Sequence, residues 1–213
     1  GNPTHLFHID QMVLEAVASP SVSPSASPSV SPSASASPSV SPSTPPGSWV
    51  DLGQQSTSTL IQIVASLGRG IAVAGDASGL GKIFRSVDFG ATWSDLGQQA
   101  SETRIYALQY LGSGIAVAGT YPHGKILRSI DEGATWGDLG QQALQEAIFS
   151  FADVGGGIAL AGSWKESGVG GGHILRSTDT GSTWADLGRQ YTQQGIISLC
   201  NVGGGVCLAG TAS

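Results

Sequence analysis

The segment Ser129-Ile-Asp-Glu-Gly-Ala-Thr-Trp136 decides the fold, because near copies of it occur at 86–93 and 177–184. All three follow the pattern Ser-x-Asp-x-Gly-x-Thr-Trp without a mismatch. In a turn between two strands, the aspartate accepts hydrogen bonds from nearby backbone amides and the glycine permits a positive φ. The tryptophan then buries a large ring on the returning strand. The positions that the pattern defines are predicted to be structural: Ser86, Asp88, Gly90, Thr92, Trp93, Ser129, Asp131, Gly133, Thr135, Trp136, Ser177, Asp179, Gly181, Thr183 and Trp184.

Around this segment the chain repeats itself from residue 47 onward. Four tryptophans, spaced by 44, 43 and 48 residues, each precede a copy of x-Asp-Leu-Gly, at Trp49, Trp93, Trp136 and Trp184. Within one unit, strand-like runs separated by glycine turns are predicted at 104–110, 114–119, 125–129 and 135–139. Four short antiparallel strands in roughly 40 to 50 residues describe one propeller blade. We therefore predict an all-β fold, a β-propeller of about four four-stranded blades with the last one incomplete.

A second repeated motif accounts for much of the glycine content. Gly-Ile-Ala-Val-Ala-Gly and its near copies occur at 70–75, 114–119, 157–162 and 205–210. Small side chains on one face suit a crowded propeller axis, so we assign these runs to the innermost strands. The glycines that precede them, as in Leu67-Gly-Arg-Gly70, are expected to supply positive φ in hairpin turns.

The three Ser-x-Asp-x-Gly-x-Thr-Trp segments resemble the Asp-box of bacterial neuraminidase (sialidase-like) repeats, and the resemblance covers 47–213. Asp-boxes are shared by sialidases, other glycoside hydrolases, sortilin-type receptors and photosystem assembly factors. In those families the box is structural, on an outer hairpin away from the central pocket, which implies that Asp88, Asp131 and Asp179 are not catalytic acids. Because one fold carries many functions, the resemblance does not decide the activity.

The catalytic residues that a sialidase would need are not recognisable. The family's first arginine lies in an Arg-Ile-Pro motif that is absent here, and Arg85, Arg128 and Arg176 are repeat-equivalent, which predicts contacts on three separate blades. No pair of carboxylates stands out for glycosidase chemistry. The four histidines lack metal-ligand spacing, and those at 123 and 173 are read as solvated loop residues. We expect no enzyme activity, no catalytic residues, no metal and no cofactor.

Residues 18–46 form a Ser/Pro-rich extended linker built from the tetrapeptides SPSV and SPSA. Small side chains and repeated prolines prevent a core and favour extended conformations. At roughly 3.1 Å per residue the tract could span about 80 Å. Such tracts are typical carriers of O-linked glycan, although a bare linker is the alternative. The candidate sites are Ser19, Ser21, Ser23, Ser25, Ser27, Ser29, Ser31, Ser33, Ser35, Ser37, Ser39, Ser41, Ser43 and Thr44.

Residues 1–17 are predicted to contain one β-strand with no core of its own. Apolar side chains fall on both of its faces, which suits a strand placed between two neighbours. The last unit lacks a third strand and an Asp-box, and Trp49–Leu52 could serve as its fourth strand. The N-terminal strand could therefore fill this vacancy in a neighbouring subunit and build a fibre; alternatively, it ends a preceding domain and more blades follow. The candidate donor residues are Leu6, Phe7, Ile9, Met12, Val13 and Leu14.

Cys200 and Cys207 fall on consecutive strands of the last unit. A four-residue turn between these strands would let the two thiols face each other and form a disulfide. A three-residue turn would put them out of register. In the second case Cys207, which replaces an alanine of the other units, is a small buried thiol.

The charge balance limits the partners. The net charge is −6 with only 11% charged residues, so the chain has no basic field for nucleic acid. No apolar run reaches about 18 residues, so no membrane span is expected. The chain begins without a methionine or a secretory signal, which indicates a mature or internal piece. We expect a secreted or cell-surface structural protein, a fibre or adhesin subunit whose partner is itself, with glycans possible. The alternative is a fragment of a sialidase-like glycoside hydrolase or a glycan-binding propeller.

Overall fold

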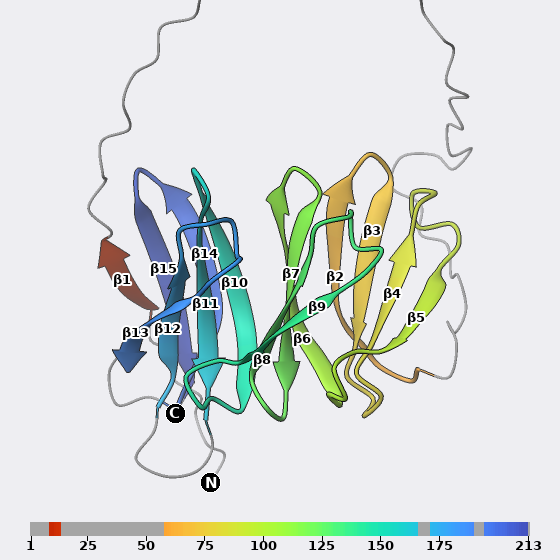
Figure 1. Ribbon diagram of the computed structural model, residues 1–213. Helices are drawn as coiled ribbons and strands as arrows, with labels where there is room; N and C mark the ends of the chain where they lie inside the picture. The colour runs from red at the N-terminus through yellow and green to blue at the C-terminus, as the bar shows by residue number, and fades with distance from the viewer. Residues whose placement is uncertain (1–8, 14–57, 166–170, 190–193, 213) are drawn as a thin grey trace, which may run out of the picture.

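The computed structural model describes residues 9–13, 58–165, 171–189 and 194–212, and all of its regular elements are β-strands (Figure 1). Blades 1 to 3 are four-stranded antiparallel meanders with strand orders β2-β3-β4-β5, β6-β7-β8-β9 and β10-β11-β12-β13. Within the described residues, no helix could cross a membrane. The predicted β-propeller architecture is confirmed.

The blades keep nearly constant strand lengths. Blade 1 consists of β2 (Ile61–Gly68), β3 (Ile71–Asp76), β4 (Lys82–Ser86) and β5 (Ser94–Gln98). Blade 2 consists of β6 (Arg104–Gly112), β7 (Ile115–Tyr121), β8 (Lys125–Ser129) and β9 (Gly137–Gln141). Blade 3 consists of β10 (Ala147–Gly155), β11 (Ile158–Trp164), β12 (His173–Ser177) and β13 (Ala185–Arg189).

Blade 4 is described as three strands: β14 (Gly195–Gly203), β15 (Val206–Ala212) and β1 (Ile9–Val13). β1 runs antiparallel to β15, with Ile9 opposite Gly210 and Val13 opposite Val206. In blade 1 the third strand pairs with the second in the same register, Ile83 opposite Gly75. The N-terminal strand therefore occupies the third-strand position of the last blade of its own chain.

The fourth strand of blade 2 begins later than predicted. β9 starts at Gly137 rather than at Thr135, because Thr135 and Trp136 still belong to the turn. The Thr135 amide donates to Asp131 and the Trp136 indole Nε1–H donates to the Gly133 carbonyl. These two bonds keep Thr135 and Trp136 in the turn, so the pairing of β9 with β8 begins only after Trp136.

The assignment of the innermost strands was wrong. The first strands, β2, β6, β10 and β14, pack against one another from blade to blade, so they lie nearest the axis, and the Gly-Ile-Ala-Val-Ala-Gly runs are second strands. Their last glycine is needed for a different reason. A Cβ at Gly75 would stand 2.6 Å from Ile105 Cγ2, and a Cβ at Gly119 would stand 2.6 Å from the carbonyl oxygen of Ile148. These glycines let the first strand of the next blade approach closely.

The hairpin turns between the first and second strands have the positive φ values that the sequence predicts. Arg69 and Gly70 have φ values of 53° and 80°, and Gly204 and Gly205 in blade 4 have 62° and 79°. Two successive positive φ values characterise the type I′ hairpin turn, which matches the twist of the strands it joins.

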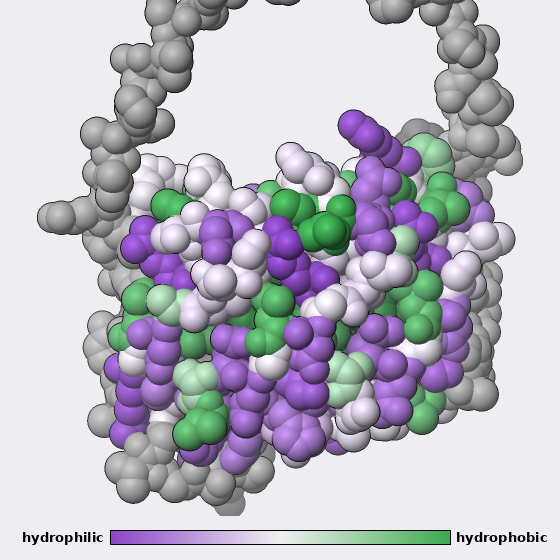
Figure 2. All heavy atoms as spheres, in the orientation of Figure 1, coloured by the Kyte–Doolittle hydropathy of each residue, from purple (hydrophilic) through white to green (hydrophobic). Residues whose placement is uncertain are grey.

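Hydrophobic residues between adjacent blades form three clusters that make up the core. The cluster between blades 1 and 2 contains Val73, Ile105 and Leu127, all almost fully buried. Blades 2 and 3 enclose Val117 and Ile148, and blades 3 and 4 enclose Leu160 and Ile196. Stability therefore resides at the blade junctions. On the face seen in Figure 2, hydrophobic residues are scattered in small groups among hydrophilic ones.

Candidate functional site

Each Asp-box is a closed network of hydrogen bonds within its own turn. In blade 2, Asp131 accepts from the Ser129 hydroxyl at 2.8 Å, from the Thr135 hydroxyl at 2.6 Å and from the Thr135 amide at 2.9 Å. The Ser129 Oγ also accepts the Gly133 amide at 2.9 Å. Blades 1 and 3 repeat these contacts around Asp88 and Asp179. Both carboxylate oxygens of the box aspartate therefore accept hydrogen bonds from its own turn.

This network lowers the pKa of each box carboxylate. Hydrogen bonds from the Thr92 side chain and amide hold the pKa of Asp88 at about 2, and those from Thr183 do the same for Asp179. Burial raises the pKa of Asp131, but the bonds from Thr135 outweigh it and the net shift is downward. Carboxylates with such low pKa values stay ionised at neutral pH and are poor general acids.

The boxes also connect one blade to the next. The Nε of Arg85 donates to the carbonyl of Glu132 in the box of blade 2 at 2.8 Å, and the Nε of Arg128 donates to Thr180 in the box of blade 3 at 3.1 Å. The prediction that these arginines make separate contacts instead of a convergent clamp is confirmed. Arg176 holds the same position in blade 3, but its buried Nε has no hydrogen-bond partner among the described residues.

The box glycines pack against the preceding blade. A Cβ at Gly133 would lie 2.8 Å from Val73 Cγ1, and a Cβ at Gly181 would lie 2.9 Å from Leu111 Cδ1. Gly90, in the box of blade 1, has only its own Trp93 within reach. The Asp-box thus joins its blade to the preceding blade. For the box of blade 1, no preceding blade lies among the described residues.

The prediction of a solvated loop residue is correct for His123, which is exposed in the loop before β8, and wrong for His173. His173 is the first residue of β12, and its Nδ1 lies 2.9 Å from Asp186 on β13. Lys125 occupies the same position in blade 2, where its bond to Asp138 raises the pKa of the ammonium group. His123 is exposed but contacts the buried carboxylate of Glu102 at 2.9 Å. Sequence reasoning missed these pairs because their members lie 13 to 21 residues apart in the chain.

The two cysteines are free, which corrects the possible disulfide. The two-residue turn at Gly204-Gly205 and the bulge beside it place Cys200 opposite Leu208, and Asn201 opposite Cys207. Neighbouring residues of a strand point to opposite faces, so the thiols point apart. Cys207 is buried and Cys200 is exposed, and the interpretation of Cys207 as a small buried thiol is confirmed.

A run of aromatic side chains crosses from blade 2 to blade 3 where β6 begins and β7 ends. The rings of Tyr106 and Phe149 are stacked at 4.6 Å, and Trp164 stands edge-on to Phe149 at 6.0 Å. Tyr121 lies 5.9 Å from Tyr106, and the Arg104 guanidinium carbon lies 5.1 Å from the Tyr121 ring. All five side chains are partly exposed. We call these residues the aromatic row; the sequence did not reveal it, because its members are separated by up to four strands.

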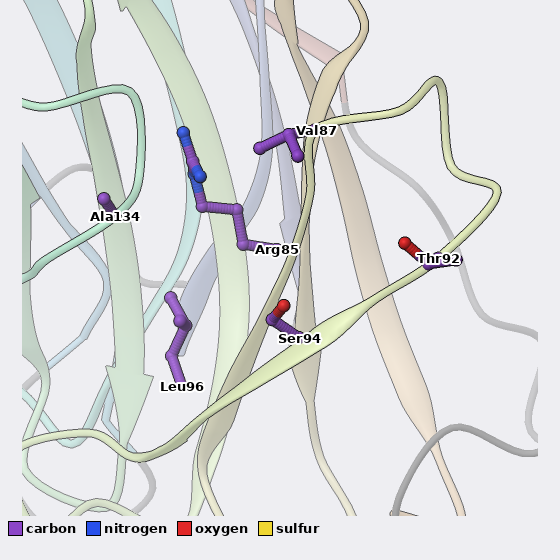
Figure 3. A pocket seen from close by; sticks show the side chains of 6 residues that line it. All are labelled: Arg85, Val87, Thr92, Ser94, Leu96 and Ala134. Atoms are coloured by element: carbon purple, nitrogen blue, oxygen red, sulfur yellow. The ribbon is translucent and has the colours of Figure 1, made fainter.

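Two hollows lie between blades 1 and 2. One of about 190 Å³ is lined by Arg85 and by Leu96 of blade 1 and by Ala134 of the next box (Figure 3). A wider one of about 580 Å³ is lined by Tyr110, Arg69 and Glu132, of which the last two form an ion pair at 3.8 Å. The first is smaller than the roughly 300 Å³ of an ordinary ligand pocket. Within the described part of the chain, no group of three potential metal ligands occurs.

The remaining predicted site residues lie largely outside the described residues. This holds for every candidate glycosylation site, for Leu6, Phe7 and Leu14 among the candidate donor residues, and for Trp49–Leu52. Ile9, Met12 and Val13 belong to β1.

Neither a protein-family model nor a curated protein sequence matches this chain. Among solved structures, the chain is similar to an ancestral GH74 enzyme at 17% identity and a TM-score of 0.54, over 67% of this chain and 20% of that one. It is also similar to YCF48 bound to D1 peptide (19%, TM-score 0.47, 60% and 39%) and to NanB sialidase from Streptococcus pneumoniae (20%, 0.42, 60% and 23%). All three are β-propeller proteins, and the chain spans less than half of each. The likeness shows the fold alone.

Proposed function

We propose that this chain is a non-catalytic, extracellular structural protein, a subunit of a cell-surface fibre or adhesin that assembles head to tail by exchange of its N-terminal strand. The observation that carries the proposal is the pairing of β1 with β15, although residues 14–46 separate β1 from the propeller in sequence. A strand on such a long connection makes the same contacts whether it belongs to its own chain or to a neighbour, and this is the condition for strand exchange.

The use of the recurring polar residues supports a structural role. Box aspartates accept hydrogen bonds from their own turns, Arg85 and Arg128 join blades, and Glu102 is occupied by His123 and Lys125. These polar groups therefore stabilise the fold through contacts within the protein. Exchange of β1 would then leave the three boxed blades unchanged and connect subunits through blade 4.

The Ser/Pro linker supports the extracellular part of the proposal. It contains no charged side chain, and glycan on its serines and threonine would keep it extended and hydrated. Intact mass spectrometry of the native protein tests this part: a mass above that of the sequence by multiples of a sugar residue supports it, and the bare mass contradicts it.

A disulfide trap tests strand exchange, because Met12 lies directly opposite Cys207 in the β1–β15 register. In a Cys200→Ser background, which removes the exposed thiol, the Met12→Cys variant is expected to cross-link to Cys207 on oxidation. Exchange between chains yields a ladder of multimers on a non-reducing gel. The matched control, Gln11→Cys, lies opposite Leu208 and should not cross-link.

A band only at the mass of one chain, at concentrations where filaments are seen by electron microscopy, would show that β1 stays in its own chain. The fibre would then not depend on strand exchange. Filaments that persist after residues 1–17 are deleted would contradict the proposal in the same way.

A glycan-binding propeller is the second candidate, and the aromatic row favours it. Partly exposed aromatic rings beside a cationic side chain give a surface on which sugar rings can stack. Binding on a glycan array that is lost in Tyr106→Ala and retained in Tyr110→Ala would support this function. Tyr110 is a suitable control because it lies outside the row and accepts a hydrogen bond from the Gly114 amide.

A further inference from the structure

We infer that the two ends of the row of blades bind each other, so that blade 4 of one copy of this chain docks on blade 1 of a second copy. This contact is separate from strand exchange and uses other residues. Figure 1 shows blade 1 and blade 4 at opposite ends of the row. The partner is therefore a second copy of the chain, in a head-to-tail contact.

The first argument is an isoleucine of blade 1 that is exposed, although its equivalents in the other blades are buried. In blades 2 to 4, the isoleucine near the start of the first strand is buried against the preceding blade; Ile105, Ile148 and Ile196 are 0%, 0% and 1% exposed. Ile61 holds this position in blade 1, since it lies opposite Asp76 as Ile105 lies opposite Thr120, and it is 39% exposed. Val64 is 59% exposed, whereas its counterpart Leu108 is 7% exposed.

The second argument is the matching vacancy at the other end. Gly75, Gly119 and Gly162 each leave room for the isoleucine of the following blade, namely Ile105, Ile148 and Ile196. Gly210 is their counterpart in blade 4, and the atoms that a Cβ there would meet belong to Ser198 of its own blade. One end of the row thus has an unburied isoleucine, and the other end has an unfilled glycine site.

The Asp-box provides a third matching pair. The box glycine of blade 2 packs on Leu67 and Val73 of blade 1. In blade 4, Val202 and Leu208 occupy the positions of Leu67 and Val73. Val202 is 55% exposed, whereas Leu67 is 4% exposed. Gly90, the box glycine of blade 1, packs on no other blade among the described residues.

Because of these three pairs, the exposed surface of blade 4 is complementary to that of blade 1, as the facing surfaces of neighbouring blades within the chain are to each other. The contact is heterologous, because it joins two different surfaces. It therefore closes into a ring if the rotation between copies allows it and otherwise continues as a filament. Burying Ile61, Val64 and Val202 also removes apolar surface from water at both ends.

The test uses the full chain with strand exchange blocked. The Met12→Cys, Cys200→Ser variant is oxidised at high dilution, so that the cross-link to Cys207 forms within one chain, and the monomer is isolated. In this background, sedimentation velocity should show association that increases with concentration. Ile61→Asp and Val202→Asp, one at each end, should each abolish it, because an unpaired charge would be buried. Ile130→Asp, at a site 68% exposed and outside both ends, should associate as the parent does.

Mixing provides the decisive measurement. A copy with Ile61→Asp keeps an intact blade 4 end, and a copy with Val202→Asp keeps an intact blade 1 end, so the mixture should form a one-to-one dimer that does not grow. This dimer also shows that both variants are folded. A parent that stays monomeric, single variants that still associate, or a mixture that stays monomeric would each overturn the inference. None of these outcomes depends on strand exchange.

Discussion

Blade 2 and blade 4 share one repeat, but they differ in what lies beside them. Blade 2 has a boxed hairpin and a neighbour on each side, and Ala116, Val117 and Ala118 of its second strand are almost fully buried. Blade 4 has β1 as its third strand, and Val202 on its far side is largely exposed. The difference shows that a boxed blade builds its sheet from its own repeat, whereas blade 4 takes its third strand from the N-terminal segment. It also shows that the burial of a blade's surface depends on the residues that the next blade supplies.

The largest expected effect comes from adding one methyl group at a blade junction. Gly119→Ala would place a Cβ 2.6 Å from the backbone oxygen of Ile148, which cannot move without shifting β10. We expect the free energy of unfolding to fall by about 2 to 3 kcal/mol, measured by urea denaturation. Gly210→Ala meets only the flexible side chain of Ser198, and its effect should stay below about 1 kcal/mol in dilute protein. Equal losses would mean that blade 4 is as constrained as blade 2.

A smaller contrast concerns the arginines. Arg128→Met removes the bond to the Thr180 carbonyl and should cost about 1 to 2 kcal/mol in thermal or urea unfolding. Arg176→Met removes a buried donor that has no partner among the described residues, so the same measurement should show no loss or a slight gain. A comparable loss at both positions would indicate that Arg176 has a partner in solution.

The box carboxylates provide a prediction about pH. Because the pKa of Asp88 and of Asp179 is about 2 in the folded protein, against roughly 3.9 in an unfolded chain, both groups favour the folded state above pH 4. This contribution should disappear as the pH falls from about 4 to about 2. Thr92→Val should raise the pKa of Asp88 and leave that of Asp179 unchanged, as measured by NMR titration of the carboxyl carbons. A low pKa for Asp88 in the variant would show that the Thr92 hydroxyl does not lower it.

The smallest expected effect leaves stability unchanged and compares the two thiols of blade 4. Cys200 is exposed, whereas burial raises the pKa of Cys207. The thiolate is the reactive form, so one thiol should react with a chromogenic disulfide reagent in native protein and two in denaturant. Rapid reaction of both in native protein would mean that the contact between blades 3 and 4 opens readily.

Local patterns were predictable because they depend on neighbours in the chain. The box turn needs an acceptor, a glycine and a tryptophan within eight residues. In the structure, Asp131 accepts a backbone amide of the turn and Gly133 has a positive φ, as the sequence predicts. The third strand of blade 2 was placed at its correct bounds, Lys125–Ser129. The third-strand position that β1 occupies was also predictable, because the repeat identifies β14 and β15 as the first and second strands of a blade.

Contacts between blades were not predictable in this way. Small residues suit both a crowded axis and a close neighbour, so the sequence alone does not distinguish the second strands from the innermost ones. Only the packing of β6 on Gly75 distinguishes the two explanations. The aromatic row escaped notice because Tyr106 and Trp164 meet through Phe149, on strands from two blades.

By itself, the sequence determined the repeat, the hairpin turns and the hydrogen-bonded turn of the Asp-box, because these follow from backbone geometry and hydrogen bonds within a few residues. The tertiary structure decided which strand faces the axis and how the blades pack on one another. Among the described residues, it also decided which arginine Nε lacks an acceptor and which blade surfaces are exposed. Those properties depend on atoms brought together from distant parts of the chain, at distances that sequence spacing does not encode.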